Sequence, residues 1–334
     1  MGTKSLYWAV LLAGLILFLG GPAAYPGSAG PRKDTSRNYP RYSVPDHVLA
    51  KPFSFAGEVI PVGRTDVQRR ICYQINFLLF DARSVLTTWL IEKNRYAWIF
   101  EEIFKKEGIP LDFLLFAAVI SNLSNKTAAG VSGAGWWAID KPCDSSDGVI
   151  MAEDSWQDDR QDVELSTKCF AARLKRIKKE LGAESWLTTA AAYLTSTKTV
   201  AEMGKRWNTL QYWDLPLPEN ADTLIARWIA LGIIDADRNY YGLKVQGDPP
   251  LTYDQITGLV LAKDLLIAEI ARMTESPPRE ILRLNRKIKA SQGRFPASVN
   301  GKQLAHSLAV PKGKGHELVD KLKKNGYLIK ESDR

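Results

Sequence analysis

The stretch LDFLLFAAVIS, residues 111–121, constrains the fold of this chain more than any other. Gly108 and Pro110 mark its start, and apolar side chains occupy nearly every position of the helix that it predicts. A helix that is apolar all round is buried, so this segment must lie inside a core. A loop rich in small residues and containing two tryptophans comes next, and irregular structure is expected from Asn122 to about Asp162.

Helical periodicity extends to both sides of this segment. Apolar residues recur at helical spacing from Asp66 to Lys106, with Asn94 as the expected break between two helices. Further helices are expected at residues 164–182, 184–194 and 219–234. The larger part of the chain is therefore predicted to be α-helical.

The C-terminal part has a different pattern, which begins after the turn formers QGDPP. Stretches rich in β-branched and apolar residues predict strands at 251–262 and 304–311, with two helices between them. Ser276 is the expected N-cap of the second helix, with Pro277 at its first helical position. Strand, helix, helix and strand form a small module, followed by a basic amphipathic helix at 315–326. The predicted fold class is therefore α+β, predominantly α-helical.

The N-terminus has the order of an export signal. Lys4 precedes an apolar run from Leu6 to Leu19, and small residues follow. The run is shorter than the roughly 20 residues that a membrane-spanning helix needs. No charge occurs between Lys4 and Arg32, so an uncleaved anchor, which would associate the protein with the inner membrane, is the second interpretation.

These patterns divide the chain into parts. Prolines, glycines, arginines and serines without a period indicate a flexible tether after the apolar run. The expected parts are a signal peptide or anchor at 1–29, the tether at 30–55, an N-terminal helical subdomain at 56–105, a larger domain at 106–245, and the small module with its basic helix at 250–334.

The three cysteines would lie, after export, in a compartment that permits disulfides. One pair and one free thiol is the simplest arrangement. We expect Cys143 in the loop to pair with Cys169 in the following helix, because that bridge would hold the flexible loop against the helix. Cys72 lies in an apolar-periodic stretch and is expected to be a buried free thiol.

Composition narrows the classes of partner. The formal net charge is +8, which would draw an exported protein towards anionic envelope polymers or membrane surfaces, and nucleic acid is not expected there. His47, His306 and His316 lie far apart in the sequence and away from the cysteines, so no metal site is expected. No phosphate loop or nucleotide motif indicates a cofactor. Ten tryptophans exceed the needs of a core of this size, and flat aromatic faces are what sugar rings pack against, although core packing is the expected role of most of them.

Five motifs, in order, resemble the lytic murein transglycosylases, in particular the membrane-bound D type with its lysozyme-like domain. They are GIPLDFLLFAAVIS, SGAGWWAI, DSWQDDRQD, AAYL and YWDLPLPE, and the resemblance covers about residues 55–245. The C-terminal module resembles a degenerate LysM fold, a peptidoglycan-binding unit, through IAEIARMTESPPREILRLN and LAVPKG. The resemblance implies a protein of the periplasm or cell envelope that contacts peptidoglycan glycan strands.

That family cleaves the glycan strand between muramic acid and glucosamine with one glutamate, which acts first as acid and then as base. The glutamate belongs to a Glu-Ser pair at the end of the buried helix, and an alignment without a gap from Gly108 places this pair on Ile120 and Ser121. A glycosidic oxygen is a poor leaving group unless it is protonated as the bond breaks, and isoleucine has no proton to give. General acid catalysis is typically worth about a hundred- to ten-thousandfold in rate, so its loss should abolish most cleavage.

Two further polar positions of the family's site have become apolar. Its Gly-Leu-Trp-Gln segment corresponds to residues 135–138, where the tryptophan is kept and the glutamine is Ala138. Its Ala-Tyr-Asn segment corresponds to residues 192–194, where the tyrosine is kept and the amide is Leu194. The resemblance implies substrate-binding roles for Ser121, Gly135, Trp137 and Tyr193. For Trp137 and Tyr193 a role in supporting the core is an equal alternative, and Ser121 could cap its helix.

Two main hypotheses follow. The first is a degenerate, non-catalytic protein of the envelope that binds peptidoglycan strands. The second is an active transglycosylase with a relocated acid, for which the candidates are Asp140, Glu153 and Asp154. A third, action through protein partners alone, has no named partner. Three other acids match family acids outside the chemistry and are expected to cap or brace the following helix: Asp158, Asp159 and Asp162.

Overall fold

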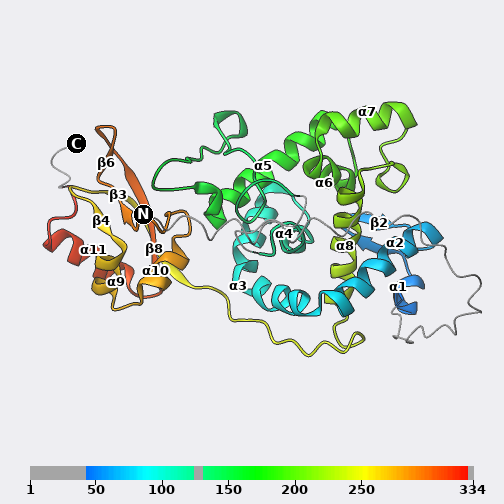
Figure 1. Ribbon diagram of the computed structural model, residues 1–334, viewed down its shortest axis with the longest axis horizontal. Helices are drawn as coiled ribbons and strands as arrows, with labels where there is room; N and C mark the ends of the chain where they lie inside the picture. Colours follow the sequence, from blue (N-terminus) through cyan, green and yellow to red (C-terminus); the bar gives the residue numbers. More distant parts are fainter. Residues whose placement is uncertain (1–42, 124–130, 330–334) are drawn as a thin grey trace, which may run out of the picture. The chain divides into compact units, whose positions relative to one another are not determined.

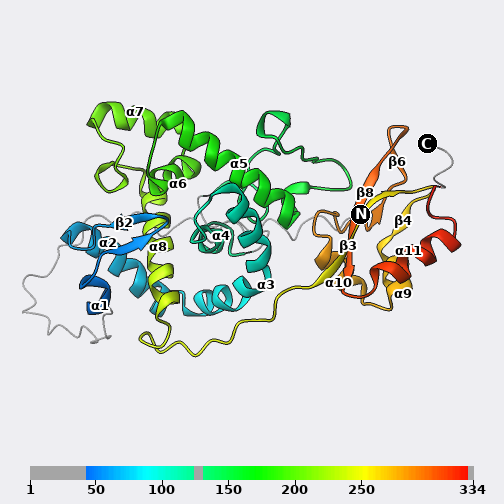
Figure 2. The same ribbon diagram turned by 180° about the vertical axis from the view of Figure 1, so that it is seen from behind.

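Helix α4 (Phe113–Ser121) lies inside the helical domain, and every one of its residues is buried. Its aromatic rings contact rings on three later helices, α5 (Val163–Leu181), α6 (Trp186–Leu194) and α8 (Glu219–Ala236). Figures 1 and 2 show these helices from opposite sides. The predicted helix that is apolar all round and enclosed in a core is confirmed.

The computed structural model describes residues 43–123 and 131–329, which all belong to one compact unit. Within these two ranges, no helix combines the length and the apolar character that crossing a membrane requires. The predicted signal peptide or anchor lies outside the described residues. Two short elements form at the end of the predicted tether, α1 (Asp46–Leu49) and β1 (Phe53–Phe55).

A small hairpin precedes the helices. β1 pairs antiparallel with β2 (Glu58–Ile60) through a two-residue turn, Ala56 and Gly57, and both turn residues have positive φ, as such turns require. The carboxylate of Asp112 accepts a hydrogen bond of 3.1 Å from the backbone N–H of Ala56. The hairpin is thereby attached to the start of α4.

The predicted helix break at Asn94 is wrong. Helix α3 (Arg83–Glu107) runs through Asn94 without interruption, and the break comes earlier, at a π-helical segment η1 (Phe77–Asp81) that separates α3 from α2 (Thr65–Asn76). The amide of Asn94 lies so close to the backbone at Gly247 that a Cβ atom there would clash with it. Tertiary packing thus outweighs the weak helix propensity of asparagine.

Helix α7 (Thr197–Trp207) was not predicted. Its apolar residues Val200, Met203 and Trp207 recur at helical spacing, but the stripe is short and only Val200 and Gly204 are buried. Its start is fixed locally, because Ser196 Oγ accepts a hydrogen bond of 3.0 Å from Thr199 N.

The C-terminal module has the predicted order of strand, helix, helix and strand, which together with the helical domain confirms the α+β, mainly helical fold class. β3 (Tyr253–Val260) pairs antiparallel with β8 (Ala305–Pro311). Between them in the chain lie α9 (Ile267–Thr274) and α10 (Pro278–Leu284), and α11 (Gly315–Lys324) follows.

The details of the module differ from the prediction in two ways. Helix α10 begins at Pro278, because a residue that precedes a proline is held in extended conformation, and Pro277 therefore takes the N-cap position in place of Ser276. Two pairs of two-residue strands, too short to show a period, were missed: β4 (Leu265–Leu266) with β5 (Arg294–Phe295), and β6 (Ser298–Val299) with β7 (Lys302–Gln303).

The module has its own hydrophobic core, and Trp156, from the loop that precedes α5, belongs to it. The Trp156 ring lies 5.3 Å from the ring of His306 and 6.3 Å from that of Phe295, between centroids. Backbone hydrogen bonds of 2.8 Å run from Lys289 N to Trp156 O and from Asp158 N to Lys287 O. The helical domain therefore completes the core of the module.

Candidate functional site

A groove of about 740 Å³ opens between the loop at residues 131–141, helix α5 and the junction of α6 with α7. Ala138, Tyr193 and Leu194, three positions that the sequence motifs had picked out, line it together. The other lining side chains are mostly charged or hydroxyl-bearing, including Asp140, Arg173, Arg176, Ser132, Thr195 and Thr197. Motifs far apart in the sequence therefore converge on one polar groove.

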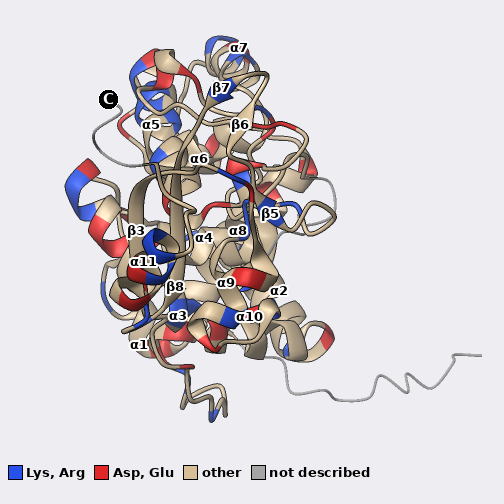
Figure 3. Cartoon of the chain, turned by 90° about the vertical axis from the view of Figure 1, so that its left-hand side faces the viewer, with Lys and Arg blue, Asp and Glu red and all other residues tan. Residues whose placement is uncertain are grey.

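The cations of α5 in this wall are paired with carboxylates of the preceding loop. Arg173 lies 3.0 Å from Asp140, and Arg176 forms an ion pair with Asp147, whose side chain is almost fully buried. Outside the groove, Lys175 on the same helix lies 2.8 Å from Glu107. The basic run at 173–180 is thus largely neutralised. Figure 3 shows acidic residues interspersed with basic ones.

A disulfide joins the two sides of this wall. Cys143 of the loop and Cys169 of α5 are bonded, with Cα atoms 5.9 Å apart, and both are buried. This is the pairing that the sequence favoured. Cys72 is free, but it is only half-buried rather than buried, because its neighbours Ile71 and Ile75 occupy the core-facing positions of α2.

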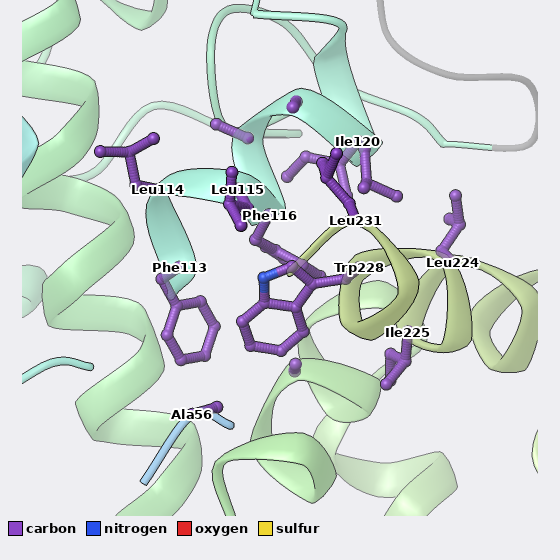
Figure 4. Close-up of a cluster of buried hydrophobic side chains, with 14 of the residues drawn as sticks. Ala56, Phe113, Leu114, Leu115, Phe116, Ile120, Leu224, Ile225, Trp228 and Leu231 are labelled. Atoms are coloured by element: carbon purple, nitrogen blue, oxygen red, sulfur yellow. The ribbon is translucent and has the colours of Figure 1, made fainter. Parts of the chain in front are cut away.

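Ile120 has no exposed surface and does not line the groove. In Figure 4 its side chain lies beside Leu231 of α8, in the cluster that also contains Leu224 and Trp228. The position at which the resemblance implies an acid is therefore filled by an aliphatic side chain within the core.

Trp137 is a core residue in this structure. Its indole is fully buried, stacks on Phe170 with 4.0 Å between ring centroids, and donates a hydrogen bond of 2.8 Å from Nε1 to Thr167 Oγ1. Of the two roles that the sequence left open for Trp137, the geometry favours support of the core, because a sugar ring cannot reach this face.

Tyr193 combines a structural contact with a place in the groove. Its hydroxyl donates a hydrogen bond of 2.6 Å to the backbone carbonyl oxygen of Trp137, and burial raises the pKa of this hydroxyl well above its usual value. The residue nevertheless lines the groove. Both roles left open for Tyr193 are therefore compatible with its position.

Gly135 and Ser121 shape the backbone next to the groove. Gly135 has a φ of +73°, and a Cβ atom there would collide with the carbonyl oxygen of Arg160, so only glycine fits. Ser121 is buried, and its hydroxyl donates a hydrogen bond of 2.8 Å to the carbonyl oxygen of Ala117 in the preceding turn of α4. Neither residue lines the groove.

No family model matches the chain. Two curated relatives are 25% identical to it over 201 residues: the membrane-bound lytic murein transglycosylase D of Escherichia coli strain K12 and that of Escherichia coli O6:H1. This chain is similar to a lytic murein transglycosylase. The matched region is 58% of this chain and 42% of each relative, so the chain matches less than half of the length of either one.

The similarity to a lytic murein transglycosylase makes the position of every carboxylate near the groove important. Asp140 lines the groove, but its side chain is 64% exposed and paired with Arg173. Glu153 is paired with Arg160 at 2.6 Å, and Asp154 accepts hydrogen bonds from the backbone N–H groups of residues 156 and 157. None of these three candidates is a sheltered acid.

Two other carboxyls of the described residues have a raised pKa. Burial raises the pKa of Asp112 and of Asp159, and each accepts a backbone hydrogen bond, from Ala56 and Ala152 respectively. Neither lines the groove. Asp158 and Asp162 accept hydrogen bonds at the starts of η3 (Asp159–Gln161) and α5, as predicted for bracing residues.

Sequence reasoning missed two cations that line the groove, Arg173 and Arg176, and the buried carboxylate behind them that pairs with Arg176, Asp147. One signal was available: Cys143 and Cys169 stand four residues from Asp147 and from Arg173 respectively, so the predicted disulfide already implied that these segments meet.

Proposed function

We propose that this protein is a degenerate lytic transglycosylase-like protein of the cell envelope, which binds peptidoglycan glycan strands in the groove without cleaving them. The observation that carries the proposal is Ile120, fully buried among aliphatic side chains where the family's acid would stand. Without a proton donor beside the leaving oxygen, bound glycan stays intact.

The composition of the groove supports binding. Ser132, Thr195 and Thr197 offer hydroxyls to sugar hydroxyls, and Tyr193 adds an aromatic side chain. Arg173 and Arg176 can bind carboxylates of the polymer after partial release from Asp140 and Asp147. Such a surface suits a long polar strand better than a small apolar ligand.

The proposal has three further parts. The two relatives are named membrane-bound, and export to the periplasm or envelope, with either a cleaved signal or an inner-membrane anchor, is proposed for this chain from residues 1–29. The order of β3, α9, α10 and β8 supports a LysM-like module as a second peptidoglycan contact. The domain boundaries at 56–105, 106–245 and 250–334 remain part of the proposal.

A pull-down with purified peptidoglycan sacculi, followed by mass spectrometry of released fragments, tests the proposal. We expect protein lacking residues 1–29 to be retained by sacculi and to release no anhydro-sugar fragments. Arg173→Gln should reduce retention, whereas Arg69→Gln, on the exposed side of α2, should not. Failure of the protein to be retained would refute the binding function.

The same experiment tests the alternative of an active enzyme with a relocated acid. Asp140 is the candidate that lies in the groove. If fragments are released, and if Asp140→Asn abolishes their release while retention persists, the protein is an enzyme and Ile120 has been wrongly interpreted. Glu153→Gln serves as the matched comparison, because Glu153 is paired with Arg160 and does not line the groove.

A further inference from the structure

A second cavity, of about 260 Å³, lies between the helical domain and the C-terminal module and shares no lining residue with the groove. Its lining on the helical side includes Trp136 and Tyr96, whose ring centroids are 4.3 Å apart. Tyr253 and Ser307 line it from β3 and β8 of the module. The cavity therefore exists only because the two parts of the chain pack together.

Three buried polar atoms of the cavity lining are unsatisfied. Trp136 Nε1, Tyr96 Oη and Gln161 Oε1 have no hydrogen-bond partner among residues 43–123 and 131–329. Trp136 and Tyr96 are almost completely buried, at 0% and 2% exposure. An unpaired buried polar group costs about 1–3 kcal/mol, so one donor, one acceptor and one hydroxyl in a single cavity indicate a site for a ligand with complementary groups.

The charges of the lining specify that ligand further. Lys287 lies 3.6 Å from Asp162, and Arg283 lies 3.7 Å from Glu280. Arg286, by contrast, makes no hydrogen bond or ion pair with any described residue, and its guanidinium lies 5.1 Å from the centroid of the Trp136 ring. A guanidinium that is held over an aromatic face and lacks an anionic partner is well placed to bind a carboxylate.

We propose that this cavity binds a short peptide with a free carboxylate. Arg286 binds the carboxylate, the Trp136 N–H donates to a peptide carbonyl, and Gln161 Oε1 accepts from a peptide N–H. The volume suits a ligand of two or three residues rather than a folded partner. The last step rests on the proposed function: if that function holds, the peptide is the stem peptide of peptidoglycan. The module and the groove then contact different parts of the same polymer.

Calorimetric titration of the full chain with the tripeptide L-alanyl-γ-D-glutamyl-diaminopimelate tests the proposal, with chitotriose as the peptide-free glycan probe. We expect the tripeptide to bind and Arg286→Gln to weaken its binding by about ten- to a hundredfold, as for the loss of one charged hydrogen bond. Arg279→Gln, on α10 a few residues before Arg286 but exposed and outside the cavity, should bind as the wild type does. Ser307→Phe, which fills the cavity from β8, should also abolish binding.

Two outcomes overturn the proposal: no binding of the tripeptide, or equal affinity in the wild type, the Arg286→Gln variant and the Ser307→Phe variant. Thermal unfolding of each variant shows whether it is folded. Sacculus retention separates this result from the proposed function. Retention without tripeptide binding refutes the cavity site alone, whereas tripeptide binding without retention of sacculi refutes glycan binding by the groove.

Discussion

The hydroxyl of Tyr193 donates a hydrogen bond of 2.6 Å to the backbone carbonyl oxygen of Trp137, and so joins α6 to the loop that forms the opposite side of the groove. Tyr193→Phe removes the donor and leaves a buried carbonyl unpaired. We expect the free energy of unfolding, measured with urea, to fall by about 1–3 kcal/mol while sacculus retention changes little. Lost retention at unchanged stability would instead assign Tyr193 to the ligand.

Ile120→Glu tests how far the site has departed from its relatives. Burial would raise the pKa of the introduced carboxyl above about 4.3, its value in the unfolded chain. As pH rises, the unfolded chain then loses the proton of the introduced carboxyl at a lower pH than the folded chain does. The variant should therefore lose stability progressively as pH rises from about 4 to 7. We expect no release of anhydro-sugar fragments, because Ala138 and Leu194 still lack polar groups.

The neutral variant Ile120→Gln is the matched control. It introduces a buried polar side chain of similar size, so its loss of stability should not depend on pH in this range. Efficient cleavage of sacculi by the Ile120→Glu variant, without any other change, would show that the rest of the catalytic site is intact.

The disulfide between Cys143 and Cys169 should contribute about 3 kcal/mol, since it closes a loop across 26 residues of sequence separation. We expect the double variant Cys143→Ala/Cys169→Ala to unfold at lower urea concentration and to bind sacculi less well, because the loop carries Asp140, which lines the groove, and Asp147, which pairs with Arg176 of the groove. Cys72→Ala, which leaves the bridge intact, should retain wild-type binding.

His306 gives the module a specific pH dependence. Burial, with a smaller effect of Lys287, lowers the pKa of His306, whose Nε2 lies 2.7 Å from the carbonyl oxygen of Pro296. Below about pH 6.5 the unfolded chain binds a proton that the folded chain does not, so stability should fall as pH decreases through this value. His306→Gln should flatten the profile of unfolding free energy against pH, whereas exchange of the exposed His316 for glutamine should not.

Elements with strong local signals were predictable from the sequence. The apolar run of α4, the Gly182 stop of α5 and the outer strands of the module all follow from side-chain pattern and backbone preference. Where tertiary contacts decide the secondary structure, the side-chain pattern alone did not predict it. Asn94 continues a helix because the chain at Gly247 packs on it. The short helix α7, by contrast, was missed although its N-cap and its apolar spacing are both present in the sequence.

The candidate site was predictable in part, for a related reason. The resemblance implied that residues 138, 193 and 194 share a site with Ile120; the groove brings the first three together, whereas Ile120 lies in the core. The sequence did not indicate that Trp137 faces inward, since a tryptophan beside a small-residue loop suits a core and a sugar surface equally well. Nor did it show that Arg173 and Arg176 are paired with loop carboxylates, because such pairs depend on a fold that charge counts do not describe.

Trp156 has a consequence for how this architecture can evolve. Its indole fills part of the core of the module, and the other buried residues of that core all come from β3 or later in the chain. The module therefore does not supply its whole core by itself. Transfer of residues 250–329 to another protein by gene fusion would leave a void the size of an indole between Phe295 and His306. Inheritance of the C-terminal part therefore depends on inheritance of the loop, and the two should diverge together rather than be shuffled separately.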